Sequence, residues 1–578
     1  MLKLFKYLKP HWKVAILGPV LLMIEVFTDL LQPTLMADIV DKGIGNGDMD
    51  FIMKTGAIMI GVAALGFLCG VGSIVASSHA GVKLGRDLRE DVYKKIQTFS
   101  FSNLDKFKAP SLITRLTNDI VQIQNIVIMA LRTLVRAPLL GIGGIVMVVS
   151  INAQLALIIL AAIVTLVIIF AFVMKKGLPF FSLLQKRIDR LNAVTRENLT
   201  GVRVVKAFVR EDTERARFHK ANTDLVDVTT RAIRLVMLVL PIIMLVINLS
   251  IIAVIWFGGI QVGQGGIEVG QIMAFINYMM IILFSLIMVA VVLVMYSRAK
   301  ASMDRVWEVL KTQADIQENL GASDEPIKTG RVDFQNVSFR YEGAGGDPVL
   351  KNISFTVHPG ETVGILGGTG SGKTTLVSLI PRLYDVTEGR VLVDGRDVRD
   401  IKLKTLRDAI GFVLQDTVLF SGTISENIRW GKKDASDEEV MEAAKAAQAH
   451  DFVTGFKEGY NTRIEQRGVN VSGGQKQRLS IARALIKKPA ILILDDSTSA
   501  VDMGTESKIQ KNLKKILKTT TCIVIAQRIS SVRDADKILV LDDGQIVDQG
   551  THDQLIKTSA IYRDIYRSQM GEEALSNG

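Results

Sequence analysis

Cysteine is nearly absent from this chain, which has two, Cys69 and Cys522, in 578 residues. Cys69 lies in an apolar run and Cys522 in a run typical of a buried strand, so both are expected to act as small core side chains. A disulfide framework or a cysteine-rich metal site is therefore not expected.

Charged residues are also scarce, at 22% of the chain, and the mean hydropathy is +0.30. Both values are unusual for a soluble protein and indicate membrane-spanning segments. The 69 basic and 58 acidic residues give a net charge of +11, which could suggest nucleic-acid binding. However, the basic residues lie mostly beside the apolar runs, so the expected partner is the lipid bilayer and no nucleic acid.

Six apolar runs reach the length of about 20 residues that one helix needs to cross a ~30 Å hydrocarbon core. They lie at about 14–36, 55–78, 130–150, 154–174, 234–257 and 271–296. The third and fourth runs are treated as two spans because residues 137–174 carry no charge and form a stretch too long for one span. At ~1.5 Å per residue, one helix of that length would exceed the bilayer nearly twofold. The break is expected at the polar cluster Ser150–Gln154.

The basic residues also predict the orientation, because cytoplasmic loops keep an excess of lysine and arginine. Residues 1–13 and 175–234 are rich in these residues and are expected to be cytoplasmic, whereas 37–54 and 258–270 are acidic or glycine-rich and are expected to be external. Residues 1–13 are expected to form a short interfacial helix rather than a signal peptide, because the next run reaches span length without a clear small-residue cleavage site.

The two long cytoplasmic connections, 79–131 and 175–231, have recurring apolar positions that predict long helices. Each connection is interrupted midway, near 107–116 and 201–212, where a short transverse helix is expected.

The chain is therefore divided into a transmembrane domain (1–312), a linker (313–330), a soluble α/β domain (331–570) and a tail (571–578). From Arg331 onward, β-branched runs alternate with helical segments, as in an α/β domain. The expected fold class is an α-helical polytopic membrane domain, with six helices and long cytoplasmic extensions, fused to an α/β domain.

The strongest local signal is a glycine-rich loop between an apolar strand, Thr362–Leu366, and a helical run, Leu376–Leu383. It has the full G-x-x-x-x-G-K-[ST] pattern, namely Gly367, Gly368, Thr369, Gly370, Ser371, Gly372, Lys373 and Thr374. Backbone N–H groups of such a loop surround phosphates, Lys373 can reach the β and γ oxygens, and Thr374 can ligate Mg²⁺. A chance glycine-rich loop is the alternative.

About 120 residues later, the apolar run Ile491–Leu494 ends in two carboxylates, Asp495 and Asp496. An acid at the end of a buried strand can hold Mg²⁺ beside the phosphates, which predicts a Walker B motif with Asp495 as the metal ligand.

The segment Val471–Arg478, which contains Ser472, Gly473, Gly474 and Gln475, resembles the signature motif of the ABC ATPase family. The same resemblance extends to Tyr341, which matches the aromatic that stacks on adenine, to Gln415 of the Q-loop, and to Ser499–Asp502 of the D-loop. Thr375 extends the expected nucleotide contacts of the loop. Six spans before one such domain resemble the bacterial multidrug-type exporter half-transporters over essentially the whole chain.

The resemblance implies that residues 331–570 form an α/β P-loop ABC ATPase domain that binds nucleotide, and that this domain uses ATP with Mg²⁺, the latter held by Thr374, Gln415 and Asp495. It also implies that two half-transporters pair, so that each ATP lies between the Walker motifs of one chain and the signature residues of the other. The expected substrate is an amphipathic small molecule, and the interruptions near 107–116 and 201–212 become candidate coupling helices.

Two catalytic positions depart from the family pattern. Asp496 stands where the family usually has a glutamate that polarises the attacking water, and Gln527 stands where a switch histidine would contact the γ-phosphate. The shorter carboxylate is retracted by about 1 Å, and misplacement of that size can cost on the order of 10²-fold in rate. The amide of Gln527 can hydrogen-bond but cannot become an imidazolium.

This double substitution resembles the degenerate-site subunit of a heterodimeric exporter, whose intact signature residues complete the partner's site. A homodimer with slow hydrolysis is the alternative, because aspartate can still act as a base. A weaker departure is Glu465-Gln466-Arg467-Gly468, where exporters usually have Gly-Glu-Arg-Gly.

Glu25 and Asp29, four residues apart in the first span, share one helical face. A charge near a helix centre costs about 2.5–3.5 kcal/mol on insertion scales, so both should face the bundle interior or a wet cavity. They form either an acidic patch that attracts cationic substrates or an internal pair satisfied by neighbouring helices.

For the chain as a whole, a dedicated lipid or peptide transporter and a nucleotide-gated regulatory membrane protein are alternative functions.

Overall fold

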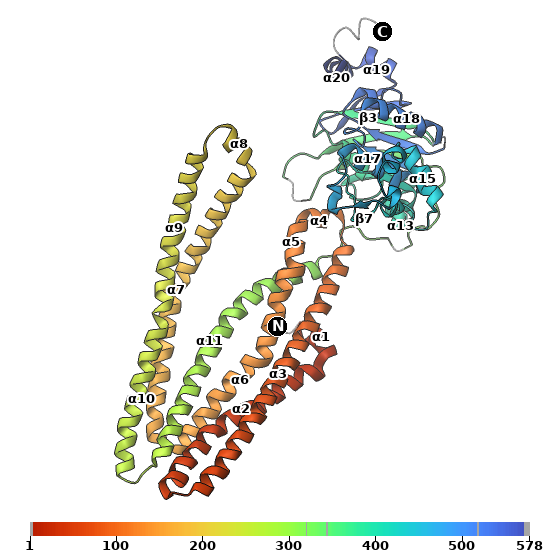
Figure 1. Cartoon of the computed structure of the whole chain (residues 1–578). Helices are drawn as coiled ribbons and strands as arrows, with labels where there is room; N and C mark the ends of the chain where they lie inside the picture. Colours follow the sequence, from red (N-terminus) through yellow and green to blue (C-terminus); the bar gives the residue numbers. More distant parts are fainter. Residues whose placement is uncertain (1–3, 320, 343–344, 517–518, 571–578) are drawn as a thin grey trace. The chain divides into compact units, whose positions relative to one another are not determined.

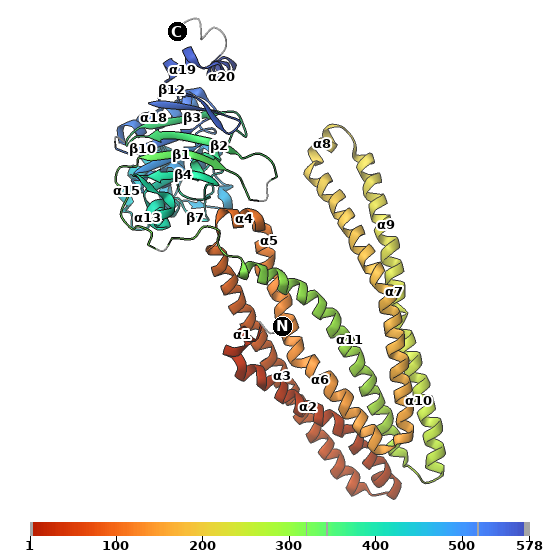
Figure 2. The ribbon, with the colours of Figure 1, turned by 180° about the vertical axis from the view of Figure 1, so that it is seen from behind.

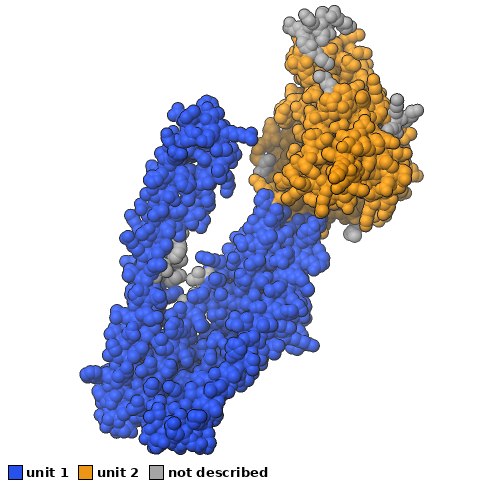
Figure 3. Space-filling view, viewed as in Figure 1, with its two compact units in different colours: residues 1–97, 110–312 blue, residues 98–109, 313–578 orange. Residues whose placement is uncertain are grey.

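The computed structural model describes residues 4–319, 321–342, 345–516 and 519–570. These residues form two compact units, which are coloured separately in Figure 3. The first contains residues up to 97 together with 110–312, and the second contains 98–109 together with the chain from 313 onward.

The first unit is helical throughout its main elements (Figure 1). Its α-helices are α1 (Phe5–Leu8), α2 (Trp12–Asp38), α3 (Met49–Gln97), α5 (Ala109–Thr114), α6 (Ile120–Ile151), α7 (Ala153–Thr200), α8 (Val202–Ala207), α9 (Glu211–Met237), α10 (Val239–Gly263) and α11 (Val269–Lys311). A π-helical turn, η4 (Arg115–Asp119), joins α5 to α6.

Six helical stretches in the described ranges are long and apolar enough to cross a membrane. The third and fourth of these are separated at Asn152, whose extended backbone interrupts the helix. The side-chain oxygen of Asn152 accepts hydrogen bonds from the backbone N–H groups of Gln154 and Leu155, so it caps the start of α7.

Small residues allow the helices of the first unit to pack closely. An added Cβ at Gly66 of α3 would lie 2.5 Å from Oγ1 of Thr28 in α2, so this contact requires glycine. Phe275, Tyr278 and Met279 of α11 are fully buried in the apolar core of the unit.

The second unit contains an antiparallel sheet in the order β2-β1-β4-β5 and a six-stranded sheet in the order β12-β11-β3-β10-β9-β6. The first sheet consists of β1 (Val332–Phe339), β2 (Leu350–Val357), β4 (Glu388–Val393) and β5 (Arg396–Asp397). The second consists of β3 (Thr362–Gly367), β6 (Ile410–Val413), β9 (Ile491–Asp495), β10 (Thr521–Ile525), β11 (Lys537–Asp542) and β12 (Gln545–Gly550), of which β12 alone runs antiparallel to its neighbour. Figure 2 shows these strands among the surrounding helices.

Helices and one further strand pair complete the second unit. They are β7 (Gly422–Thr423), β8 (Arg463–Ile464), α4 (Phe101–Phe107), α12 (Lys373–Ser378), α13 (Leu403–Asp408), α14 (Ile424–Arg429), α15 (Asp437–Ala446), α16 (His450–Thr454), α17 (Gly473–Leu485), α18 (Met503–Ile516), α19 (His552–Thr558) and α20 (Ala560–Met570).

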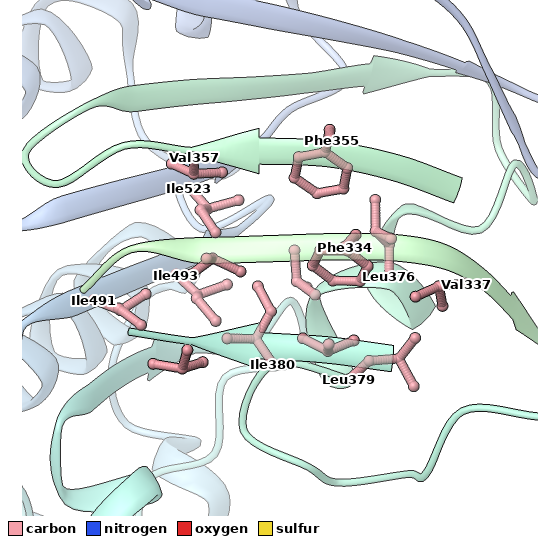
Figure 4. Close-up of a cluster of buried hydrophobic side chains, with 14 of the residues drawn as sticks. Phe334, Val337, Phe355, Val357, Leu376, Leu379, Ile380, Ile491, Ile493 and Ile523 are labelled. Carbon is pink, nitrogen blue, oxygen red and sulfur yellow. The ribbon is translucent and has the colours of Figure 1, made fainter. Parts of the chain in front are cut away.

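The core of this unit joins both sheets, as Figure 4 shows. Phe334 and Phe355 are register partners in β1 and β2, and their rings stack with centroids 4.6 Å apart. Ile491, Ile493 and Ile523 bring buried side chains from β9 and β10 to the same cluster. The expectation for the cysteines is confirmed, since both are free and buried, and burial raises the pKa of the Cys522 thiol to about 12.

The first short transverse helix lies earlier than the sequence predicted. It is α4, and the predicted range 107–116 instead contains α5 and the π-helical turn. The helix begins at Ser100, whose side chain forms a capping box with Asn103, and it ends at Lys108, which has a φ of +52°. Capping chemistry therefore decides its position more than Pro110 does. The second short helix, α8, lies within the predicted range 201–212.

Candidate functional site

Three adjacent parallel strands, β3, β10 and β9, bring the predicted catalytic segments to one edge of the sheet. Ile525 in β10 is the register partner of both Ile365 in β3 and Asp495 in β9. The carboxyl ends of all three strands thus lie side by side. The glycine-rich loop follows β3, Asp496 follows β9 and Gln527 follows β10.

The loop Gly367–Thr374 requires glycine at specific positions. Gly370 and Gly372 have φ angles of +85° and +97°, which side chains disfavour. A Cβ at Gly367 would lie 2.2 Å from the carbonyl oxygen of Leu541. The loop backbone can therefore curve in a way that a chance sequence of larger residues could not.

Lys373 lies almost fully buried inside this loop. Its ammonium donates to the carbonyl oxygens of Gly367 at 2.9 Å and Gly368 at 2.6 Å. Burial lowers the pKa of Lys373, whereas the carboxylates of Asp495 and Asp496 act in the opposite direction. An ammonium held in this way is well suited to pair with phosphate oxygens.

Asp495 and Thr374 fit a Mg²⁺ ion. Asp495 is 1% exposed, and its Oδ2 atom is buried with no hydrogen-bond partner among the described residues, while a hydrogen bond joins its carboxyl group to Thr374. Burial raises the pKa of Asp495, and the nearby Asp496 raises it further. A divalent ion would satisfy this carboxylate and would neutralise phosphate charge when bound.

Gln415, the other expected metal ligand, follows β6 at the same edge of the sheet and is exposed. Tyr341 and Thr375 meet directly, since their hydroxyl oxygens are 2.9 Å apart. The ring of Tyr341 packs edge-on against Tyr384, with centroids 5.3 Å apart. Tyr384 in turn donates a hydrogen bond to Asp105 of α4 at 2.7 Å, so α4 is linked to the region of the loop within this unit.

Asp496 and Gln527 are in direct contact. Nε2 of Gln527 donates to Oδ2 of Asp496 at 3.2 Å. Asp496 has a φ of +46°, and its N–H donates to the carbonyl oxygen of Ile525 at 3.0 Å, which holds the residue in this unusual conformation. Burial raises the pKa of Asp496, whereas Lys373 and Arg528 oppose this rise.

The signature residues lie at the start of α17. The Ser472 hydroxyl accepts from the N–H of Gln475 at 3.3 Å, and the Gln475 side chain accepts from the N–H of Ser472 at 2.8 Å. This capping box leaves Ser472 and Gly473 exposed at the positive end of the helix dipole. A Cβ at Gly474 would lie 2.8 Å from the carbonyl oxygen of Ala500, so the signature packs against the D-loop.

Gln477 was not singled out from the sequence, yet it holds the D-loop. Its side-chain oxygen accepts from the N–H of Ala500 at 3.0 Å, and its amide donates to Ser499 Oγ at 3.1 Å. Ser499 itself donates to the carbonyl oxygen of Asp496 at 3.0 Å. Asp502 accepts from the N–H of Thr505 at 2.9 Å at the start of α18. The position of Gln477 within the signature segment was the only available signal.

Gln569, in the last helix, was also missed. Its amide donates to the carbonyl oxygen of Gln527 at 2.7 Å, and its side-chain oxygen accepts from the N–H of Ile529 at 2.8 Å. Gln569 therefore holds the segment that presents Gln527. No local pattern marks it, because it lies 42 residues along the chain from Gln527.

In the membrane unit, Glu25 and Asp29 are paired with Arg136 of α6. One guanidinium nitrogen contacts Glu25 Oε1, and another lies 2.8 Å from Asp29 Oδ2. The carboxylate of Glu25 also lies on Gly70 of α3, where a Cβ would be 3.1 Å from its carboxyl carbon. Of the two sequence alternatives, this arrangement favours the internal pair, and Arg136 was the unrecognised partner.

Comparisons with known proteins agree with both units. The ABC transporter transmembrane region matches residues 15–286, and the ABC transporter ATPase family, described as "ABC transporter", matches residues 350–499. The chain is 44% identical to "Uncharacterized ABC transporter ATP-binding protein YfiB" of Bacillus subtilis (strain 168), over 99% of each chain.

Two relatives carry names that specify a cargo. An "ATP-dependent lipid A-core flippase" of Syntrophus aciditrophicus (strain SB) is 34% identical over 87% of this chain and 84% of the relative. A "Fatty acid ABC transporter ATP-binding/permease protein" of Mycobacterium bovis is 38% identical over 83% of this chain and 76% of the relative. A solved structure, "Structure of a bacterial Atm1-family ABC exporter with ATP bound", has a TM-score of 0.79 and 27% identity and covers 96% of this chain and 98% of that chain.

Proposed function

Because this chain belongs to the ABC transporter family, with the membrane and ATPase domains of an exporter half-transporter, we propose that it powers export of amphipathic compounds across the cytoplasmic membrane by alternating access. It is a multi-pass membrane protein with six membrane-crossing helices and a cytoplasmic ATPase domain. ATP binds at the Walker segments, with Thr374, Gln415 and Asp495 holding Mg²⁺.

The substrate is a lipid-like or drug-like amphiphile. The cargoes in the names of the two relatives, lipid A-core and fatty acid, support the lipid-like class. The pairing of Glu25 and Asp29 with Arg136 removes the main argument for a cation-attracting cavity. A dedicated homodimeric lipid or peptide exporter with slow hydrolysis is the second candidate.

The single observation that carries the rest of the proposal is the hydrogen bond between Gln527 and Asp496. The neutral amide of Gln527 hydrogen-bonds to the Asp496 carboxylate that would polarise the attacking water, and the side chain of aspartate has a shorter reach than that of glutamate. This chain's own site therefore binds ATP and hydrolyses it slowly.

Its exposed signature residues, Ser472 and Gly473, complete the competent site of a second half-transporter. The hairpin tip around α8 supports such pairing, since Phe208 and Val209 are 72% and 80% exposed there. Large apolar side chains exposed together are typical of docking surfaces. A heterodimer is favoured because the impaired Walker site and the intact signature assign different roles to the two chains.

The test is an ATPase assay on the purified chain alone and together with a candidate partner half-transporter in lipid nanodiscs. We expect ATP binding with little turnover by the chain alone, and substantial turnover with the partner. Full activity of the isolated chain would refute the degenerate site and favour the homodimer. Nucleotide binding without turnover in any combination would favour a nucleotide-gated regulatory protein instead.

A further inference from the structure

The chain passes between its two compact units at three points: between residues 97 and 98, 109 and 110, and 312 and 313. The first two points flank α4, and the third follows α11. In the membrane unit, charged side chains join η4, which lies after α4 and α5 in the chain, to the end of α11. In the ATPase unit, polar side chains join α4 to the linker that follows α11.

On the membrane-unit side, two ion pairs cross between η4 and α11. Arg305 of α11 donates to both carboxylate oxygens of Asp119, at 2.8 and 2.5 Å. In the opposite sense, Arg115 of η4 donates to Glu308 at 2.8 Å and to the carbonyl oxygen of Arg305 at 2.6 Å. One partner of each pair is buried, since Asp119 and Arg115 are only 1% and 8% exposed, whereas Arg305 and Glu308 are about half exposed.

On the ATPase-unit side, Asp315, three residues beyond Thr312, accepts from the residues that begin α4. The amide of Asn103 donates to its Oδ2 at 2.8 Å, and the hydroxyl of Ser102 contacts the same atom. Ser100, which caps the helix, also reaches Asp315, at 3.4 Å. The start of the linker and the start of α4 are therefore held together inside this unit.

We propose that Asp119, Arg305 and Asp315 are positioning residues that make the α4 segment and the end of α11 move as one element. Displacement of the ATPase unit then enters the membrane unit through α6 and α11 together. These two helices pack against each other beyond the ion pairs, so a shift at their cytoplasmic ends is carried along both (Figure 2).

The charge pattern supports a positioning role over simple packing. An apolar contact would hold these segments without the cost of desolvating Asp119 and Arg115. Crossed pairing, which is bidentate between Arg305 and Asp119, instead specifies one relative position of η4 and α11, because both pairs have to align.

The inference rests on the proposed alternating-access function, so the experiment measures the two separately. The assembled transporter is placed in lipid nanodiscs with Trp256 as its sole tryptophan in this chain, after Trp12, Trp307 and Trp430 are each changed to Phe. Acrylamide quenching of Trp256, with and without Mg-ATP, reports on the membrane unit, and fluorescence of TNP-ATP reports on nucleotide binding.

We expect Arg305→Ala and Asp315→Ala to lose the Mg-ATP-dependent change in quenching, while TNP-ATP affinity stays within about twofold of the parent. Asp315 is exposed, so its replacement should leave folding intact even if Arg305→Ala does not. Combining Asp119→Arg with Arg305→Asp should restore part of the lost change.

The matched control is Arg86→Ala, since Arg86 also pairs with an aspartate, Asp87, but within one helix. This variant should behave like the parent. Parent-like quenching changes in Asp315→Ala, or loss of TNP-ATP binding together with the quenching change, would overturn the inference. A parent protein that shows no nucleotide-dependent change would instead overturn the alternating-access proposal, and the inference with it.

Discussion

The side-chain amide of Gln527 donates a hydrogen bond to Oδ2 of Asp496 across 3.2 Å. The two residues lie 31 positions apart and follow neighbouring parallel strands, β10 and β9. The two residues that are proposed to limit hydrolysis thus meet in one contact. They are best treated as a pair, because a change in one alters the surroundings of the other.

Restoring both family residues should restore hydrolysis. Asp496→Glu extends the carboxylate by about 1 Å, and Gln527→His supplies a group that can carry a proton, so the double variant should gain on the order of 10²-fold in ATPase rate. The rate is measured at saturating Mg-ATP. Each single variant should gain less than the double, because the remaining residue still limits the site.

Lys373→Ala in the double-variant background is the control, and it should abolish the gain by removing the phosphate contact. An unchanged rate in the double variant, with normal nucleotide binding, would show that these residues do not limit turnover.

Ser472→Ala should abolish most of the hydrolysis of the assembled transporter while leaving nucleotide binding at this chain's own Walker site unchanged. The reason is that Ser472 is exposed at the start of α17, where it is proposed to meet the partner's ATP. ATPase activity and TNP-ATP binding are measured in parallel.

Ser436→Ala is a matched control, because Ser436 caps α15 with the same reciprocal hydrogen bonds that Ser472 makes in α17. Both variants should lose a similar stability of about 1 kcal/mol. Equal ATPase rates in the two variants would argue that Ser472 serves only as a helix cap.

Arg136→Met should destabilise the membrane unit by about 3–5 kcal/mol, because it leaves Glu25 and Asp29 without their cation. Adding Glu25→Gln and Asp29→Asn to this variant should recover most of the loss. The measurement is thermal unfolding in nanodiscs.

Arg132→Met is the control here, since Arg132 lies one turn earlier on α6 and no ion pair joins it to the described side chains. Its effect should be much smaller than that of Arg136→Met. Similar unfolding temperatures for the two variants would contradict a structural role of the Arg136 pairing.

The affinity for Mg-ATP should fall on acidification at a higher pH than an ordinary aspartate would give, because burial raises the pKa of Asp495. Mg²⁺ has to compete with a proton for this carboxylate. The Mg²⁺-dependent part of TNP-ATP binding is measured against pH, with Asp495→Asn expected to lack the pH-dependent component.

The raised pKa of Asp495 also affects the pH dependence of folding stability, and there the effect has the opposite sign. Because the folded-state pKa lies above the unfolded value, Asp495 contributes stability at low pH that is lost as the pH rises through the raised pKa. In EDTA, unfolding of Asp495→Asn should lack this contribution. For the binding prediction, the contrary outcome is a pH midpoint of Mg²⁺-dependent TNP-ATP binding at or below the pH at which an exposed aspartate titrates.

The fold class could be predicted from sequence because its signals are local. A run of apolar residues needs only sufficient length to indicate a membrane span, and the alternation of strands and helices after Arg331 indicates an α/β domain. The glycine-rich loop could be recognised for the same reason, since its chemistry depends on eight consecutive residues.

Contacts between distant segments were decided by tertiary structure. The state of Glu25 and Asp29 depended on Arg136, more than 100 residues away. The sequence by itself determined which segments cross the membrane and which residues are suited to phosphate chemistry. Only the packing of strands and helices decided that Gln527 meets Asp496, because such contacts depend on how separate elements are brought together in space.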